Sequence, residues 1–260
     1  MDLPIEIWQQ CLFKSDFLSQ IRLRCVRKLF YTRLEIHDFR TISYVYTYRL
    51  TNEILQNYPF IRELRAGGIR NITNVNYLAN LEILEAEADC GINDDGISKL
   101  NLRELIAYNN PHITTVNHMS RLEILDANYN CGIDDKGISN LNLKRLYASY
   151  NPRITNVNHM SRLEILHASD MCGIDDKGIT NLNLIELDAC NNSKITNVNH
   201  MSKLKRLNAD WNCGIDNQGI ANINLTFLYA VANSKITNVD HMDKLEILHS
   251  NEIPPLLIKT

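Results

Sequence analysis

The chain has 260 residues, a formal net charge of −3 at pH 7 and 45% hydrophobic residues, which suits one elongated domain with a small appendage. The mildly acidic balance argues against general nucleic-acid binding, which requires a basic surface. No run of 18 apolar residues is present, so no membrane span is expected, and Asp2, Glu6 and Lys14 interrupt the apolar pattern that a signal peptide would need.

Residues 1–38 are predicted to form a small helical module. Leu3-Pro4 places a proline in the first turn of a helix, which continues through Ile7, Cys11 and Leu12 at helical spacing. Asp16 is a suitable cap for a second helix, whose apolar positions are Leu18, Ile21, Cys25 and Leu29. We expect both cysteines on apolar helix faces, where a thiol is usually inert.

Residues 39–80 are predicted to be degenerate first repeats. The apolar spacing of a strand is seen at Phe39, Ile42 and Tyr44. The apolar face of a short helix is expected next, at Leu50, Ile54 and Leu55. The regular series then begins with Ile61, Leu64 and Ala66. Gly67-Gly68 is expected to leave a bare patch on the inner face.

From Leu81 the sequence repeats every 41 residues, with further copies starting at Leu122, Leu163 and Leu204 and a truncated one at Leu245. Each copy is itself double, because the LxxLxAxxN pattern that starts at Leu122 recurs at Leu143. A fixed period of 20 or 21 residues indicates stacked repeats that share one core. We therefore predict regular repeats over 81–244 and a C-terminal cap over 245–260.

The pattern also predicts which side chains face the core. Leu122, Leu125 and Ala127 point inward from a short strand, whereas Asp126 and Asn128 point outward, because side chains alternate along a strand. The asparagine at the ninth position is expected to turn inward and bond to main-chain groups. These asparagines are Asn110, Asn130, Asn151, Asn192, Asn212 and Asn233.

The first half of each copy continues as C-G-I-[DN]-[DN]-x-G-I. Its polar pair suits the N-cap of a short convex helix, and the following isoleucine anchors that helix. The pairs are Asn93-Asp94, Asp134-Asp135, Asp175-Asp176 and Asp216-Asn217, and the isoleucines are Ile97, Ile138, Ile179 and Ile220.

Two further ladders recur every 41 residues: Cys90, Cys131, Cys172 and Cys213, and His118, His159, His200 and His241. Members of a ladder are two strands apart, about 10 Å, which is too far for a disulfide or a shared zinc ion. We expect buried structural thiols, structural histidines and no bound metal. Seven cysteines, an odd number, then favour a reducing intracellular location, cytoplasmic or nuclear.

The repeat resembles the leucine-rich repeats, with alanine in place of the third leucine, and its cysteine-containing half resembles the form found in F-box proteins. This resemblance implies an α/β fold: a curved leucine-rich-repeat solenoid with a parallel inner sheet over 39–260. Residues 1–38, with LPxEI and RLRCVRKLF, resemble an F-box, which implies docking on the Skp-type adaptor of ubiquitin ligases. The adaptor-binding positions would be Leu3, Pro4, Ile7, Leu12, Leu18, Val26 and Phe30. The composition, which is rich in Asn and Ile, also resembles that of F-box repeat proteins of large DNA viruses of amoebae.

The chain contains no phosphate-binding loop, GxSxG elbow or HExxH motif, so we expect no catalytic activity of its own and no cofactor. Two functions remain open. The chain is a substrate receptor that brings a target to a cullin-type ubiquitin ligase, or a stand-alone binding or scaffolding protein whose helices only cap the solenoid.

The expected target-binding surface is the concave face, formed by the fifth, seventh and eighth residues of each repeat. Acidic residues outnumber basic ones there, and aromatic residues, which are enriched at binding hot spots, lie among them. We therefore expect a basic protein or peptide as the target. The candidate residues are Glu85, Tyr108, Asp126, Tyr129, Tyr147, Tyr150, His167, Asp170, Asp188, Asp210, Trp211 and Tyr229.

Overall fold

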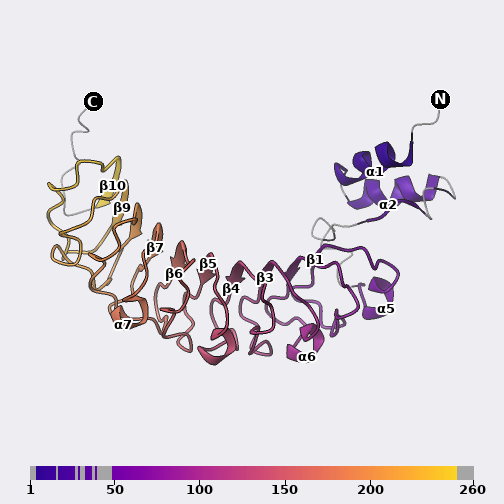
Figure 1. The fold of residues 1–260 in the computed structure, drawn as a ribbon, viewed down its shortest axis with the longest axis horizontal. Helices are drawn as coiled ribbons and strands as arrows, with labels where there is room; N and C mark the ends of the chain where they lie inside the picture. The colour runs from indigo at the N-terminus through magenta and orange to yellow at the C-terminus, as the bar shows by residue number, and fades with distance from the viewer. Residues whose placement is uncertain are drawn as a thin grey trace.

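The structure is a computed structural model, and it describes residues 4–15, 17–26, 29, 33–36, 39 and 49–250. Its main feature is a curved arc lined on the inner side by ten short strands (Figure 1). The strands are β1 (Glu63–Arg65), β2 (Ile83–Glu85), β3 (Glu104–Ile106), β4 (Ile124–Asp126), β5 (Arg145–Tyr147), β6 (Ile165–His167), β7 (Glu186–Asp188), β8 (Arg206–Asn208), β9 (Phe227–Ala230) and β10 (Ile247–Ser250).

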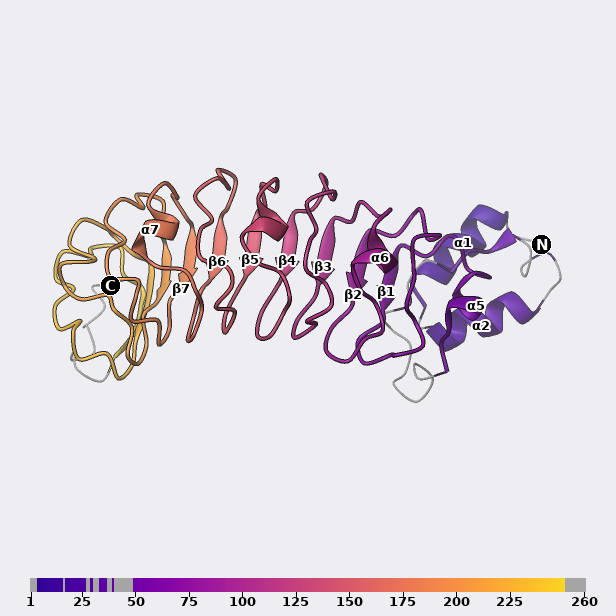
Figure 2. The ribbon, with the colours of Figure 1, turned by 90° about the horizontal axis from the view of Figure 1, so that it is seen from below.

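Each strand pairs in parallel with the next strand along the chain, so the sheet order is the sequence order. Figure 2 shows this succession from the outer side of the arc. The register places the same repeat position side by side, for example Leu125 opposite Leu146 and Leu146 opposite Leu166. The predicted curved solenoid with a parallel inner sheet is therefore confirmed over the described repeats.

The core is one continuous stack of the inward repeat positions. Leu122 is 4% exposed, and Leu125 and Ala127 are fully buried, as their counterparts are in neighbouring repeats. Full burial of one leucine side chain stabilises a fold by roughly 1.5–3 kcal/mol. The third inward position of each repeat from β1 to β9 is alanine, such as Ala127, whose small side chain takes up little space in the core. No single repeat encloses its own apolar edge, so the stack folds as a unit.

The ninth-position asparagines divide into two groups. Asn110, Asn151, Asn192 and Asn233 are buried as predicted. Asn151, for example, donates to the carbonyls of Ala127 and Ile133, and its Oδ1 accepts from the Arg153 amide. For Asn130 and Asn212 the prediction was wrong, because both are exposed. In those repeats the following cysteine, Cys131 or Cys213, takes the inward place.

The outer side of the arc carries short helices: α5 (Asn52–Leu55), α6 (Asp94–Ile97), the 3₁₀ helix η1 (Lys136–Ile138) and α7 (Asp176–Ile179) (Figure 1). The first residue of each polar pair accepts from the glycine amide three residues later, as Asp175 does from Gly178 at 3.0 Å. That position requires glycine, because a Cβ on Gly178 would lie 2.1 Å from the Thr155 carbonyl oxygen. The predicted convex helices are confirmed in the first three copies, but in the fourth copy the prediction was wrong, because residues 217–220 are in turns.

The second residue of each polar pair clamps two repeats together, which was not predicted. The Asp176 carboxylate accepts from the backbone amide of Thr196 at 2.7 Å and from its hydroxyl at 2.6 Å. Asp94 and Asp135 bond to Thr114 and Thr155 in the same way. These bonds join the first half of each copy to the second half.

The cysteine and histidine ladders are structural, as expected. The four ladder cysteines are buried free thiols, and burial raises the pKa of the Cys131 thiol to about 12. Each ladder histidine places Nε2 3.0–3.2 Å from the carbonyl oxygen of a convex isoleucine in the preceding repeat. A carbonyl only accepts, so this nitrogen carries the proton.

The N-terminal helices α1 (Ile5–Phe13) and α2 (Phe17–Val26) lie beyond β1, at one end of the arc (Figure 1). They have a small core of their own, in which Leu12 and Leu34 are buried against Ile5, Trp8 and Leu23. The chain then enters the main core, where Phe39 is buried and its amide donates to the Glu63 carbonyl at 2.8 Å. The boundary at residue 38 stays a prediction.

The expectation for Cys11 and Cys25 was wrong, because both are exposed. The inner face of α1 is formed instead by Ile5, Trp8 and Leu12. The proposed cap Asp16 and the strand positions Ile42 and Tyr44 lie outside the described residues. No helix in the described part of the chain is long and apolar enough to cross a membrane.

Candidate functional site

The concave face carries all twelve residues predicted to bind a target. Trp211 is 59% exposed, and Tyr129 and Tyr150 are about 40% exposed. The other nine are partly buried: Glu85, Tyr108, Asp126, Tyr147, His167, Asp170, Asp188, Asp210 and Tyr229. Strand alternation accounts for the outward orientation at the fifth and seventh positions, but the role of all twelve residues in binding stays a prediction.

One line of side chains runs along the middle of the sheet, and we call the fifth repeat position from Asp126 to His249 the central row. The strand register places Asp126, Tyr147, His167 and Asp188 next to one another in that order. Tyr147 and His167 make an edge-to-face contact with ring centroids 4.8 Å apart. Two carboxylates therefore flank a contacting pair of aromatic rings.

A second line, the edge row, is formed by the eighth repeat position where each strand ends. Tyr129, Tyr150 and Trp211 have φ values of 61°, 59° and 59°, in the left-handed region that disfavours a Cβ. The fold imposes this conformation, because the amide of this residue donates to the next repeat, as Tyr129 does to the Ser149 carbonyl at 2.8 Å. For a residue other than glycine it costs roughly 1–2 kcal/mol.

Two aromatic residues of the edge row contact each other, and one of them also contacts a tyrosine at the seventh position. Tyr129 and Tyr150 stack at 4.7 Å between ring centroids with an interplanar angle of 19°, and Tyr108 contacts Tyr129 at 4.8 Å. The hydrogen bond between Tyr150 and Asp170 raises the pKa of the tyrosine. The result is an exposed aromatic surface that ends in a carboxylate.

Three carboxylates on the concave face are held in a poorly hydrated environment. Burial raises the pKa of Asp126, Asp188 and Asp210, because a desolvated carboxylate favours its neutral form. One backbone amide offsets part of this effect in each case, from Asn128 and Cys190 at 3.0 Å and from Val231 at 2.6 Å. Perturbed carboxylates of this kind gather at functional sites.

The sequence interpretation missed the third repeat position, which faces the same side as the fifth. Glu186 and Arg206 line a cavity of about 140 Å³ together with His167, Asp188, Asn208 and Tyr229. The Arg206 side chain lies 3.3 Å from Glu186 and 4.4 Å above the Phe227 ring. Strand alternation could have found these residues, because they stand two positions before the central row.

The predicted adaptor-binding residues whose side chains are described differ in exposure. Leu12 is fully buried in the helical module, whereas Ile7 and Val26 are 40% and 67% exposed. Pro4 is an exposed residue that precedes α1. Leu18 lies in α2 with its side chain outside the described residues, as are Leu3 and Phe30. Leu29, which was not included, is 54% exposed.

Metal and redox chemistry receive no support from the described side chains. No group of three His, Cys, Asp or Glu residues that could hold a metal ion is found in that part of the chain. Cys190, at the seventh position near the central row, has its pKa raised to about 12 by burial. A thiol in that state is a poor nucleophile.

The parallel strands, the inward Leu and Ala layers and the curved inner sheet define a leucine-rich-repeat solenoid. No protein-family model and no curated protein matches the sequence.

Solved structures that resemble the chain are repeat proteins of low identity. The functional domain of InlJ from Listeria monocytogenes, which includes a cysteine ladder, has a TM-score of 0.48 and 22% identity over 75% of this chain and 46% of that one. The L. monocytogenes internalin inlF has a TM-score of 0.48 and 20% identity, covering 80% and 67%. TLR13 in its complex with ssRNA13 has a TM-score of 0.36 and 14% identity, covering 85% and 39%. The chain spans less than half of the InlJ domain.

Proposed function

We propose that this chain is a receptor subunit that holds a basic protein segment on its concave face and docks on a Skp-type adaptor through its N-terminal helices. Ubiquitin transfer would then belong to partner subunits, and this chain would supply proximity. Two observations made together carry the proposal. The concave surface contains strained backbone and partly desolvated carboxylates, and the helical module has exposed apolar side chains.

The concave surface supports a binding role because it includes features that a stable fold does not need. Glycine or asparagine would suit the left-handed edge row better than Tyr129, Tyr150 or Trp211. Burial of Asp126 and Asp188 likewise disfavours their charged forms. Strained backbone and desolvated charge are typical of binding sites.

Charge on this face favours a basic target. The fifth, seventh and eighth positions of the described repeats contain the acidic residues Glu85, Glu87, Asp126, Asp170, Asp188 and Asp210 and the base Arg65. Arg65 is already paired with Glu85 at 2.7 Å. At the third position, Arg206 is paired with Glu186. A Lys/Arg-rich segment would be attracted by the carboxylates and would contact the aromatic rings.

The helical module supports adaptor docking because several of its apolar side chains are exposed to solvent. Ile7, Val26 and Leu29 are exposed although Leu12 and Leu34 form a buried core nearby. Several exposed apolar side chains on one small module indicate an interaction surface. The resemblance to an F-box identifies a Skp-type adaptor as the partner.

The alternative, a stand-alone binding protein with a helical cap, is favoured by a different observation. Phe39 and Ile36 belong to the main core, and Phe39 contacts Tyr58 at 5.1 Å between ring centroids. The segment that follows the helices thus covers the β1 end of the stack. Capping uses Ile36 and Phe39, whereas Ile7 and Val26 are exposed, so adaptor binding distinguishes the two functions.

The test is binding of a purified Skp-type adaptor to the full chain. Ile7→Asp combined with Val26→Asp should weaken binding at least about tenfold, because charges replace apolar contacts. Ile54→Asp is the matched control, since Ile54 has the same 40% exposure as Ile7 but lies in α5. If the wild-type chain binds no adaptor, the stand-alone function is favoured.

The proposal also includes a reducing intracellular compartment, cytoplasmic or nuclear, and no catalytic activity of the chain itself. The support is the seven free cysteines, of which Cys11 and Cys25 are exposed. Exposed thiols stay free where glutathione keeps them reduced. A mixed disulfide at Cys11 or Cys25 in protein isolated without reductant and with thiols trapped by alkylation would contradict that location.

A further inference from the structure

At one position in the second half of the 41-residue copies, the side chain reaches back over the preceding repeat in two of the four copies. Its position is occupied by His112, Arg153, Lys194 and Lys235 in the four copies. The Lys194 ammonium donates to the Cys172 carbonyl oxygen, and the Lys235 ammonium donates to that of Cys213 at 2.9 Å. In the last two copies, then, a long cationic side chain covers the carbonyl of the ladder cysteine.

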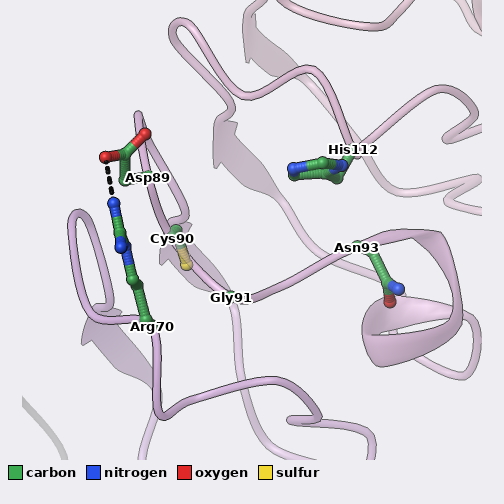
Figure 3. Close-up of a pocket in the computed structure, with 6 residues that line it drawn as sticks. All are labelled: Arg70, Asp89, Cys90, Gly91, Asn93 and His112. Carbon is green, nitrogen blue, oxygen red and sulfur yellow. Dashed lines mark hydrogen bonds and ion pairs between the residues drawn. The ribbon is translucent and has the colours of Figure 1, made fainter.

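In the first copy the equivalent residue is His112, which is too short to repeat this contact. A cavity of about 410 Å³ lies there, lined by Arg70, Asp89, Cys90, Gly91, Asn93 and His112. Figure 3 shows the Arg70–Asp89 pair on one side and the His112 ring on the other, with Cys90 and Gly91 between them. No described residue donates to the Cys90 carbonyl oxygen.

The polar groups around this cavity include one ion pair and one carbonyl acceptor that no described residue uses. Asp89 stands where the other copies have Asn130, Met171 and Asn212, so a carboxylate is found at this position only in the first copy. Arg70 lies 2.7 Å from Asp89, and both side chains are more than three-quarters exposed. Arg70 is therefore balanced by Asp89, and the carbonyl of Cys90 remains an unused acceptor.

We propose that this cavity binds an alkylammonium group, the chemistry of a lysine side chain, with its head on the Cys90 carbonyl oxygen and near Asp89. The chain contains its own template, because Lys194 and Lys235 place the same group on the equivalent carbonyls. The site goes beyond the proposed function, since it lies past the strand ends, outside the concave rows. Its ligand is a lysine of a partner protein or a free polyamine.

The competing occupant is an anion held by Arg70 and His112. We favour the ammonium because Arg70 already has a carboxylate partner, whereas the carbonyl has none among the described residues. Arg153, at the same position in the second copy, makes no bond of this type within that part of the chain, so the lysine length and head group are the relevant features.

The test uses NMR of the ¹⁵N-labelled full chain, with the backbone amides of Gly91 and Asn93 as reporters. The probes are lysine with both termini capped, the same compound acetylated at Nε, putrescine and inorganic phosphate. We expect the capped lysine to shift both amides and the acetylated form to bind at least about tenfold more weakly, because acetylation removes the charge. Putrescine that binds more tightly than capped lysine would identify free polyamines as the ligand class.

Two variants make the test specific. His112→Lys should place the chain's own ammonium in the cavity, abolish the response to capped lysine and raise the midpoint of thermal unfolding. Lys235→His should open an equivalent cavity in the fourth copy, so that Gly214 then responds to the same probe. Unchanged affinity in His112→Lys would overturn the proposal, as would phosphate shifting the two amides while capped lysine does not.

Discussion

Tyr129 and Tyr150 stack at 4.7 Å between ring centroids although both residues have positive φ values. The backbone is left-handed at this point in every described repeat from β1 to β9. Gly68, Asn109, Asp170 and Asn191 are of residue types that adopt this conformation readily, whereas Ala88, Trp211 and Ala232, like the two tyrosines, are not. Two aromatic side chains at such positions form a contact surface, although the left-handed backbone conformation is unfavourable for a residue that has a Cβ. Within the proposed function, we therefore expect the edge row to be the part of the concave face that contacts the target most closely.

The first prediction concerns the contact made by Tyr150. Replacement by alanine keeps the backbone conformation that Ala88 and Ala232 already show but removes the ring. Binding of a fluorescent octalysine peptide, measured by anisotropy, should weaken about tenfold, as for an aromatic hot spot. Phe60→Ala is the control, because Phe60 is 45% exposed outside both rows. Equal affinities for wild type and Tyr150→Ala would remove the edge row from the site.

The second prediction concerns charge. Exchange of Asp126 and Asp170 for lysine changes the charge of the concave face by four units, so electrostatic attraction of octalysine is lost. Affinity at low salt should fall, and its dependence on salt concentration should become flatter. Exchange of the convex residues Asp95 and Asp240, both exposed, gives the same net charge. If that control variant behaves identically, the attraction belongs to the whole protein and not to the concave face.

A third prediction tests the left-handed position itself. Ala232→Gly should raise the free energy of unfolding by roughly 1 kcal/mol, because φ is 59° and glycine has no Cβ penalty there. Gly68→Ala should lower it by a similar amount, and by strain alone, because an added Cβ on Gly68 would meet nothing within 4 Å. Chemical denaturation measures both. Ala148→Gly, at a buried inward position, is the control and should destabilise the fold.

Most of the scaffold could be predicted from the 41-residue period, because repetition fixes which positions are inward. The period gave the inward Leu and Ala layers, the caps such as Asp175 and the buried cysteines. It failed at Asn130 and Asn212, where the LxxLxAxxN pattern matches but Cys131 and Cys213 take the inward place. In these two repeats the inward residue of the turn after the strand is one position later, and the LxxLxAxxN pattern does not indicate this shift.

The candidate site was predictable only in part. Outward orientation at the fifth and seventh positions followed from alternation, whereas alternation alone would turn the eighth position inward. The third position, with Glu186 and Arg206, was overlooked. The left-handed backbone could not be inferred, since tyrosine and tryptophan are not residues that indicate positive φ. In the helical module the apolar spacing suggested Cys25 and Leu29 as inward, but both are exposed, because short amphipathic patterns fix a helix face poorly.

The fourth prediction links the central row to pH. Burial raises the pKa of Asp188 in the folded state, so its charged form destabilises the fold, and stability present at low pH is lost as pH rises through the folded pKa. Asp188→Asn should therefore increase the free energy of unfolding at pH 7, and the gain should vanish below the ordinary aspartate pKa of about 3.9. An asparagine oxygen still accepts from the Cys190 amide. A gain that does not depend on pH would contradict this explanation.

The fifth prediction compares two asparagines at the same repeat position. Asn151 is buried, and its side chain bonds to the carbonyls of Ala127 and Ile133 and to the amide of Arg153, whereas Asn130 is exposed. Asn151→Ala leaves these buried groups without partners, at about 1–3 kcal/mol for each, so the unfolding midpoint should fall steeply. Asn130→Ala should change the free energy of unfolding by no more than about 0.5 kcal/mol. Urea unfolding of both variants measures the difference. Similar losses in the two would mean that the ninth position acts through the turn backbone and not through the buried amide.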